Sequence, residues 1–191
     1  MSDVVRNFIS VYGNDAVKST HREVIRRLNE HKGDDPYAHI GEVLYGLRPE
    51  TAKLGRDQVS ANWVRLAHDY GDDDVLGIDS GGYTPDQLLN HIVWFYSKVD
   101  PDCVLVNEYD HENTDFVGGA FRLVRKSKIR TFEKFRHTTY IVSQQPESSN
   151  QEDDSIEHIS WEQFWDIKQE LVQEAKEVML SEFPEFRRYF F

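Results

Sequence analysis

The hydrophobic pattern of the first 70 residues predicts one strand followed by two helices. Residues 4–12 alternate in polarity and are rich in strand-forming side chains, which predicts a first strand. After a turn at residues 13–15, apolar residues recur at helical spacing over residues 16–31, and a shorter run with this spacing covers residues 38–47. The pattern of residues 58–70 fits neither period, so we assign it no element.

The clearest helix signal lies in the middle of the chain, after a short predicted strand over residues 75–79. Thr84 is suited to accept hydrogen bonds from the first-turn amides, Pro85 suits the first helical position, and Gln87 completes a capping box. A broad apolar stripe at helical spacing follows. The Asp-Pro pair at residues 100–101 disfavours helical angles, so the predicted helix ends there.

Strand patterns follow this helix. Residues 103–106 form an apolar run, and residues 116–124 are its predicted hairpin partner, with a pattern that allows continuation through residue 129. The two glycines at 118–119 are interpreted as a bulge within that strand. Residues 137–142 are a further strand candidate.

The last fifty residues divide into a polar segment and a helix. Residues 143–158 are rich in Ser, Gln, Asn and acidic side chains, which predicts a mobile acidic loop. Ser160 is then placed to cap a helix, with Gln163 three residues on to complete a capping box. An apolar stripe at helical spacing runs from there to Met179, and Pro184 stops the helix.

The order strand, helix, strand, strand, helix, strand predicts an α+β protein with the split βαβ plan of ferredoxin-like folds. We expect an antiparallel sheet with two helices on one face, an extra hairpin strand and a C-terminal helix. Residues 1–142 would form the ferredoxin-like core domain and residues 143–158 the acidic mobile loop. Residues 159–191 would form a helix and an aromatic tail packed on the core.

Composition narrows the class of protein. The net charge of −12 disfavours a general affinity for nucleic acid or for an anionic membrane. The one cysteine, Cys103, excludes an internal disulfide and lies in an apolar strand, which indicates a buried, inert thiol. No basic stretch precedes a long apolar run near residue 1, and no apolar span reaches the length of a bilayer. We therefore expect a cytoplasmic protein without a membrane partner.

Short motifs are spread over residues 4–125. They are Asn-Phe-Ile-Ser-Val-Tyr-Gly at 7–13, Tyr-Thr-Pro-Asp-Gln-Leu at 83–88, Asp-Pro at 100–101, Asn-Glu-Tyr-Asp at 107–110 and Asp-Phe-Val-Gly-Gly at 115–119. This series resembles the Api92-like, ferredoxin-like domain family of phage and mobile-element proteins. The resemblance implies a ferredoxin-like core, a viral or plasmid origin and the cytoplasm of a host cell. It implies no reaction and carries over no catalytic residue.

Charges are segregated along the chain. Residues 66–121 carry twelve acidic residues and one basic residue, residues 122–136 carry seven basic and one acidic, and residues 137–182 carry eleven acidic and two basic. This order predicts a basic strip between two acidic surfaces. The surfaces are either solvated faces or recognition surfaces for a charged partner.

The favoured hypothesis is a non-enzymatic, phage-type protein that binds and inhibits a host protein. The partner would be a defence factor or a nucleic-acid-binding protein, and the carboxylates would imitate phosphates. The expected contact residues are Asp72, Asp73, Asp74, Asp110, Glu112, Glu152, Asp153 and Asp154.

The second hypothesis is a module that binds RNA or single-stranded DNA through the basic strip, with Phe132 and Phe135 interleaved for base stacking. Its residues are Arg122, Arg125, Lys126, Lys128, Arg130, Lys134 and Arg136. The total charge of the chain opposes this hypothesis, so nucleic acid is not the expected partner.

A third hypothesis is a small enzyme whose site lies near residues 107–112, where polar residues cluster after a strand. A polar hairpin turn explains the same cluster. We assign no catalytic residue, cofactor or metal, because the acidic run at residues 68–74 lacks the spacing of an EF-hand loop and no Cys-His set has zinc spacing. The aromatic residues of the last helix either pack on the core or form a homodimer or partner surface.

Overall fold

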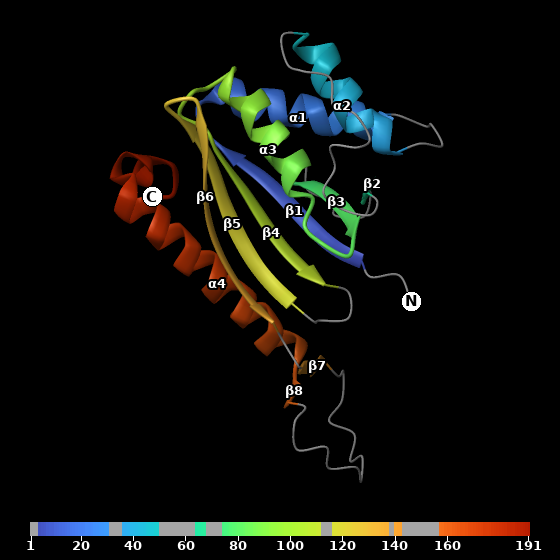
Figure 1. Ribbon diagram of the computed structural model, residues 1–191, viewed down its shortest axis with the longest axis vertical. Helices are drawn as coiled ribbons and strands as arrows, with labels where there is room; N and C mark the ends of the chain where they lie inside the picture. The colour runs from blue at the N-terminus through green and yellow to red at the C-terminus, as the bar shows by residue number, and fades with distance from the viewer. Residues whose placement is uncertain are drawn as a thin grey trace.

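A six-stranded antiparallel sheet forms the centre of the molecule, and helices lie on both of its faces (Figure 1). The computed structural model describes residues 4–30, 36–49, 64–67, 74–111, 116–137, 140–142 and 157–191. The sheet order is β2-β3-β1-β4-β5-β6, and each neighbouring pair is antiparallel. The strands are β1 (Val4–Tyr12), β2 (Val64–Leu66), β3 (Leu76–Gly81), β4 (Val104–His111), β5 (Phe116–Arg125) and β6 (Lys128–His137).

Strand β1 lies inside the sheet, between β3 and β4, and has the bounds that its sequence pattern predicts. Because β3 and β4 are both antiparallel to β1, they run parallel to each other, and helix α3 (Asp86–Ser97) connects them. The short strands β7 (Tyr140–Val142) and β8 (Glu157–Ile159) form a separate parallel pair. The α+β class predicted from the sequence is confirmed.

Two layers of helices enclose the sheet (Figure 1). Helices α1 (Asp15–Glu30) and α3 lie on one face, with α2 (Pro36–Leu47) beside α1. Helix α4 (Trp161–Glu182) crosses the opposite face over β4, β5 and β6, and a 3-10 segment, η3 (Pro184–Tyr189), follows it. Among the helices described, none is both long and apolar enough to span a bilayer.

The alternation of side chains along the strands divides the core into two parts. On β5, Phe121 and Leu123 belong to the same buried cluster as Met179 of α4, whereas Val124 packs against the cluster on the side of α1 and α3. Burying one such side chain fully stabilises the fold by about 1.5–3 kcal/mol. Both faces of β5 therefore contribute to the core.

The two predicted helix caps have different outcomes. Pro85 occupies the cap position of α3 without a side-chain hydrogen bond, and the Thr84 hydroxyl donates instead to Asp86 Oδ1 at 3.2 Å. If Thr84 were the cap, the helix would begin at Pro85, but it begins at Asp86. The prediction that Thr84 caps this helix is therefore wrong. The capping box of α4 is confirmed: Gln163 N donates to Ser160 Oγ at 3.1 Å, and Ser160 N donates to Gln163 Oε1 at 2.8 Å.

The strand predicted to continue through residue 129 ends earlier, at Arg125. The chain reverses at Lys126 and Ser127, whose φ angles are 48° and 59°, and returns as β6. Positive φ at both central residues is the geometry of a two-residue type I′ hairpin, which Asn and Gly usually occupy. Because neither residue type stands here, the turn was not recognisable. For the same reason His137, expected at the start of a strand, ends β6.

The interpretation of Gly118 and Gly119 as a bulge is wrong, because β5 keeps one-to-one register with both neighbouring strands. The glycines allow close packing on opposite faces. A Cβ at Gly118 would lie 2.5 Å from the backbone oxygen of Lys134, and one at Gly119 would lie 2.6 Å from Val172 Cγ2 of α4.

The aromatic residues of the C-terminal segment divide between the core and the surface, where Trp161, Trp165 and Phe191 are exposed. Phe164 and Phe186 are fully buried, and the ring centroid of Phe190 lies 4.6 Å from that of Tyr12.

Cys103 is buried as expected, and burial raises the pKa of its thiol to about 12. The predicted loop at 143–158 lies outside the described residues, except for its last two residues, which begin β8.

Helix α1 carries a buried histidine that makes stability depend on pH. His21 Nε2 lies 3.1 Å from the carbonyl oxygen of Asp74, which can only accept, so Nε2 carries the proton. Its Nδ1 then accepts from the Tyr96 hydroxyl at 2.6 Å. Burial lowers the pKa of His21 from 6.5 to about 4, although the nearby Asp74 carboxylate opposes this shift and Arg22 reinforces it.

We expect the free energy of unfolding to fall as the pH decreases from about 6.5 towards 4. In that range the unfolded chain protonates His21 and the folded chain does not, which removes about 3 kcal/mol of stability. Urea unfolding at several pH values checks this, with His21→Gln as the reference because a neutral amide does not titrate. The wild type should lose more stability than the variant, and identical pH slopes would contradict the prediction.

Candidate binding groove

Six of the eight predicted acidic contact residues lie outside the described residues: Asp72, Asp73, Glu112, Glu152, Asp153 and Asp154. Asp74 is exposed, and its carboxylate accepts hydrogen bonds from Arg22 Nε at 2.5 Å and Nη2 at 3.1 Å. These hydrogen bonds lower the pKa of Asp74. Its charge is therefore already matched by a cation of its own chain.

The expectation that Asp110 lies on an acidic contact surface is wrong, because its side chain is completely buried. Strand β4 continues through this position, and strand alternation turns Asp110 towards α4. Its carboxylate accepts hydrogen bonds from Lys168 Nζ at 2.9 Å and Arg6 Nε at 2.6 Å. Asp110 thus connects the sheet to α4.

Lys168 is unusual because its ammonium group is buried under the sheet. It lies 4.2 Å from the ring centroid of Phe8 and 4.8 Å from that of Trp165, so two ring faces supplement the Asp110 carboxylate. Burial lowers the pKa of Lys168, and the charge of Asp110 opposes that shift. This closed arrangement makes Lys168 a structural cation.

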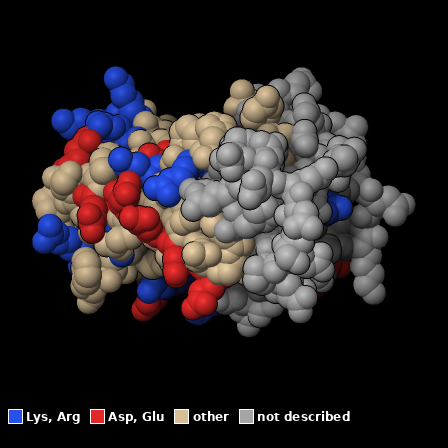
Figure 2. Space-filling view, turned by 90° about the horizontal axis from the view of Figure 1, so that it is seen from below, with Lys and Arg blue, Asp and Glu red and all other residues tan. Residues whose placement is uncertain are grey.

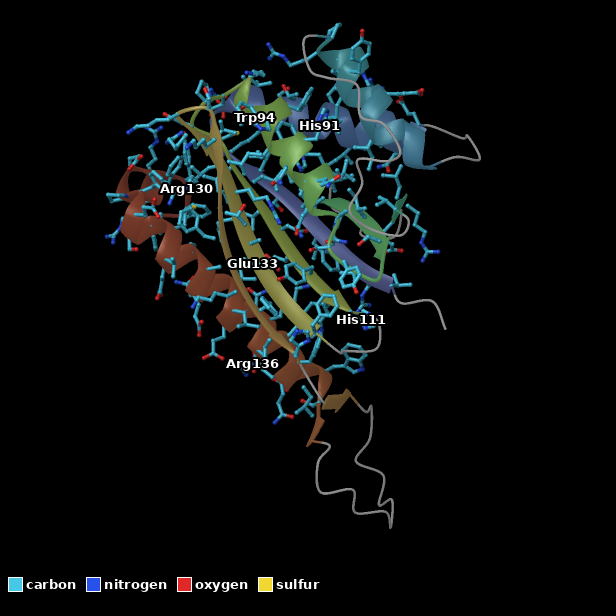
Figure 3. The ribbon with its side chains drawn as sticks, viewed as in Figure 1. His91, Trp94, His111, Arg130, Glu133 and Arg136 are labelled. Atoms are coloured by element: carbon cyan, nitrogen blue, oxygen red, sulfur yellow. The ribbon has the colours of Figure 1, made fainter. Side chains whose placement is uncertain are left out.

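The polar cluster proposed as an enzyme site is divided between the two faces of β4. Asn107 and His111 lie on the α3 side, where Asn107 Nδ2 donates to Asn7 Oδ1 at 3.2 Å. Glu108 and Asp110 lie on the α4 side. Figure 3 shows His111 near the end of this strand. Residues on opposite faces of a strand do not converge on one substrate, so these residues do not form a single site.

One member of the predicted basic strip, Arg122, is buried, so its placement in an exposed phosphate-binding strip is wrong. Its Nη2 donates to Asp86 Oδ1 at 2.6 Å, on the α3 side of β5. Burial lowers the pKa of Arg122, and the charges of Asp86 and Glu133 oppose this. Strand alternation separates Arg122 from the charged residues of β6 that face α4.

Helix α4 and its neighbours neutralise other members of the strip. Figure 3 shows Arg130 and Arg136 on the strand that borders this helix, and Figure 2 shows basic and acidic side chains adjacent to one another on one face. The sequence therefore separates charges that the fold brings together. The ion pairs are Arg125 with Asp102 (3.1 Å), Arg130 with Glu182 (2.5 Å) and Lys134 with Glu174 (3.8 Å).

The aromatic residues of β6 are not placed to stack bases beside the basic residues of the strip. Phe132 is buried with Met179 against α4. Phe135 is 55% exposed, but it lies on the opposite face of β6 from Lys134 and Arg136. In the described part of the chain, three members of the strip remain exposed without an ion pair: Lys126, Lys128 and Arg136. They are too few to form the predicted strip.

A groove lies on the α3 side of the sheet, next to the start of α3, and encloses about 470 Å³. The loop before α3 contributes one wall, and β4, β5 and β6 form the floor and the other wall. Tyr83 and Phe135 are 68% and 55% exposed. The lining residues are Tyr83, Thr84, Asp86, Tyr109, Phe116, Glu133, Phe135 and His137.

Hydrogen bonds fix the polar residues of the groove. The Tyr109 hydroxyl donates to Glu133 Oε1 at 2.6 Å, and Asp86 holds Arg122 beneath the lining. Burial, followed by the hydrogen bond to Glu133, raises the pKa of Tyr109, so its hydroxyl keeps its proton. Glu133 lies on the open sheet surface in Figure 3. The groove can therefore offer a carboxylate and several aromatic rings to a ligand.

The sequence did not identify this groove, because its residues come from four separate segments. The sequence suggests base stacking for Phe135 beside the basic strip, and it places Asp86 only in the first turn of a helix. Tyr83, Tyr109 and Phe116 lie in three separate short motifs, and their residue types alone do not indicate a shared surface. Within the described residues, no three His, Cys, Asp or Glu side chains form a metal-binding group.

We found no match to this chain among models of protein families, curated proteins or solved structures.

Proposed function

We propose that this protein is a non-catalytic binding module that docks a segment of another protein in the groove. The observation that carries the proposal is the pair of exposed rings, Tyr83 and Phe135, beside a preformed concave surface. Aromatic residues dominate the energetics of protein interfaces, because they bury a large area with few rotatable bonds. A groove that also fixes its polar groups by internal hydrogen bonds loses little freedom on binding.

We further propose that the partner is a host protein inhibited by a phage-type protein, as the resemblance to the Api92-like family implies. Tyr83, Asp86, Tyr109 and Phe116, which belong to the resembling motifs, line the groove. A ferredoxin-like core is part of this proposal. It is supported by the order of the first four strands and by the parallel pair β3 and β4 flanking β1. We propose the groove as the contact surface, in place of the acidic residues expected from the sequence. One of those residues, Asp110, is buried and cannot contact a partner.

Replacing both rim rings, as Tyr83→Ser with Phe135→Ser, should weaken partner binding at least about 30-fold, because an interface hot spot contributes about 2 kcal/mol or more. Affinity capture from a bacterial lysate with the wild type provides the prey, and calorimetry with the purified prey measures the dissociation constant. The matched control is Tyr45→Ser with Phe191→Ser, which removes two exposed rings of the same types elsewhere. Equal affinity of the wild type and the groove variant, or equal loss in the control, would refute the proposal.

A further inference from the structure

The groove carries more negative than positive charge. Asp86 and Glu133 line it, whereas neither Lys nor Arg is among its lining residues. Arg122 lies beneath the lining and its charge is offset by Asp86, 2.6 Å away. The negative charge of Glu133 is therefore not balanced by a cation of the groove. Within the described residues it accepts one hydrogen bond, from Tyr109 at Oε1, which leaves Oε2 and the second lone pair of Oε1 available.

Several aromatic rings line the same groove as this carboxylate. The rings of Phe116 and Tyr109 lie edge-to-face, with centroids 6.1 Å apart. The rings of Phe135 and His137 also lie edge-to-face, with centroids 5.5 Å apart. Tyr83 and Phe135, which also line the groove, are largely exposed and add accessible ring surface. Ring faces are electronegative and attract cations, most strongly where water is displaced.

We propose that the groove binds the guanidinium group of an arginine side chain presented by the partner segment. This inference rests on the proposed function, since it specifies what the groove recognises in the docked segment. A planar guanidinium stacks on a ring face and donates two parallel hydrogen bonds to a carboxylate, which a lysine ammonium does not do. An anionic ligand is disfavoured, because Glu133 would repel it and the cation beneath is already paired.

The test uses single amino-acid amides as probes of the intact protein. Nα-acetyl-arginine amide should cause saturable shifts in the aromatic NMR signals of Tyr83, Phe116 and Phe135. Nα-acetyl-citrulline amide, which has the same shape without the charge, should bind at least about tenfold more weakly. Nα-acetyl-lysine amide should bind more weakly than the arginine probe.

Glu133→Gln should weaken binding of the arginine probe about tenfold, because it removes the charge but keeps an oxygen that accepts from Tyr109. Glu170→Gln is the matched control, since Glu170 is an exposed carboxylate on α4. Equal binding of arginine and citrulline probes, tighter binding of the lysine probe, or no binding of any probe would overturn the inference.

The two proposals can fail separately. If Tyr83→Ser with Phe135→Ser abolishes partner binding but Glu133→Gln leaves it unchanged, the groove docks a partner without recognising arginine. A second outcome is that the arginine probe binds and Glu133→Gln weakens its binding, but the groove variants leave partner binding unchanged. In that case the groove recognises a guanidinium group, and the proposed docking role is wrong.

Discussion

Replacing Asp110 with alanine is expected to lower the free energy of unfolding by about 3–5 kcal/mol, since removing one partner of a buried ion pair leaves an uncompensated charge. The side chains of Asp110 and Lys168 are 0% and 1% exposed, and their charged atoms are 2.9 Å apart. The rings of Phe8 and Trp165 would remain next to the ammonium group, but a cation–π contact recovers only about 0.5–2 kcal/mol. Arg6 would lose its acceptor as well.

Urea unfolding and thermal melting measure this effect, and a fall in Tm of roughly 10 °C is expected for a chain of this size. Asp102→Ala is the matched control, because Asp102 is half exposed and pairs with Arg125 and Arg188 near the surface. Asp102→Ala should lower the free energy of unfolding by no more than about 1 kcal/mol. If both variants lose the same stability, the buried ion pair does not hold α4 on the sheet.

Phe164→Ala is expected to lower the free energy of unfolding by about 3–5 kcal/mol through the cavity it leaves. Phe164 is completely buried near the start of α4, where it packs with Val117 of β5, Ile159 and Leu171. This small cluster is separate from the larger core nearer the end of α4. The rings of Trp161 and Trp165 also contact Phe164, but both are exposed on their other side, so the cavity would open towards solvent. The first half of α4 should therefore loosen before the rest.

Hydrogen exchange can follow that local loosening, and chemical unfolding gives the global loss. Phe191→Ala is the control, since this ring is 90% exposed and its removal should change stability by less than about 0.5 kcal/mol. Increased exchange confined to the first turns of α4 is the expected result for Phe164→Ala. Unchanged exchange there would show that the remaining contacts suffice to anchor the helix.

The charge pattern illustrates how sequence order and spatial order differ. The basic run of β6 and the acidic residues of α4 are far enough apart in the chain to suggest separate surfaces, but α4 packs along β6 and pairs Glu182 with Arg130 and Glu174 with Lys134. Exposed pairs of this kind contribute only about 0.2–1 kcal/mol each. Their main consequence is that the basic residues involved already have partners.

Several elements were predictable because their signals are local. The alternation in β1, the helical spacing in α1 and α3 and the capping box at Ser160 all depend on residues close in sequence. The turn at Lys126 and Ser127 was not predictable, because its positive φ angles are imposed on residues that rarely adopt them. The packing role of Gly118 was also hidden, since Lys134 comes close to it only after β5 and β6 pair.

The α+β class, most of the strands and helices, and the burial of Cys103 follow from the sequence, because periodicity and polarity act within a few residues. The face that each side chain presents to distant elements became known only from the packing of the sheet and helices. That packing had three consequences for the predicted sites. It buried Asp110 against Lys168, removed Arg122 from the basic strip and gathered Tyr83, Glu133 and Phe135 around one groove. The physical reason is that strand pairing and helix packing join segments whose separation along the chain carries no local signal.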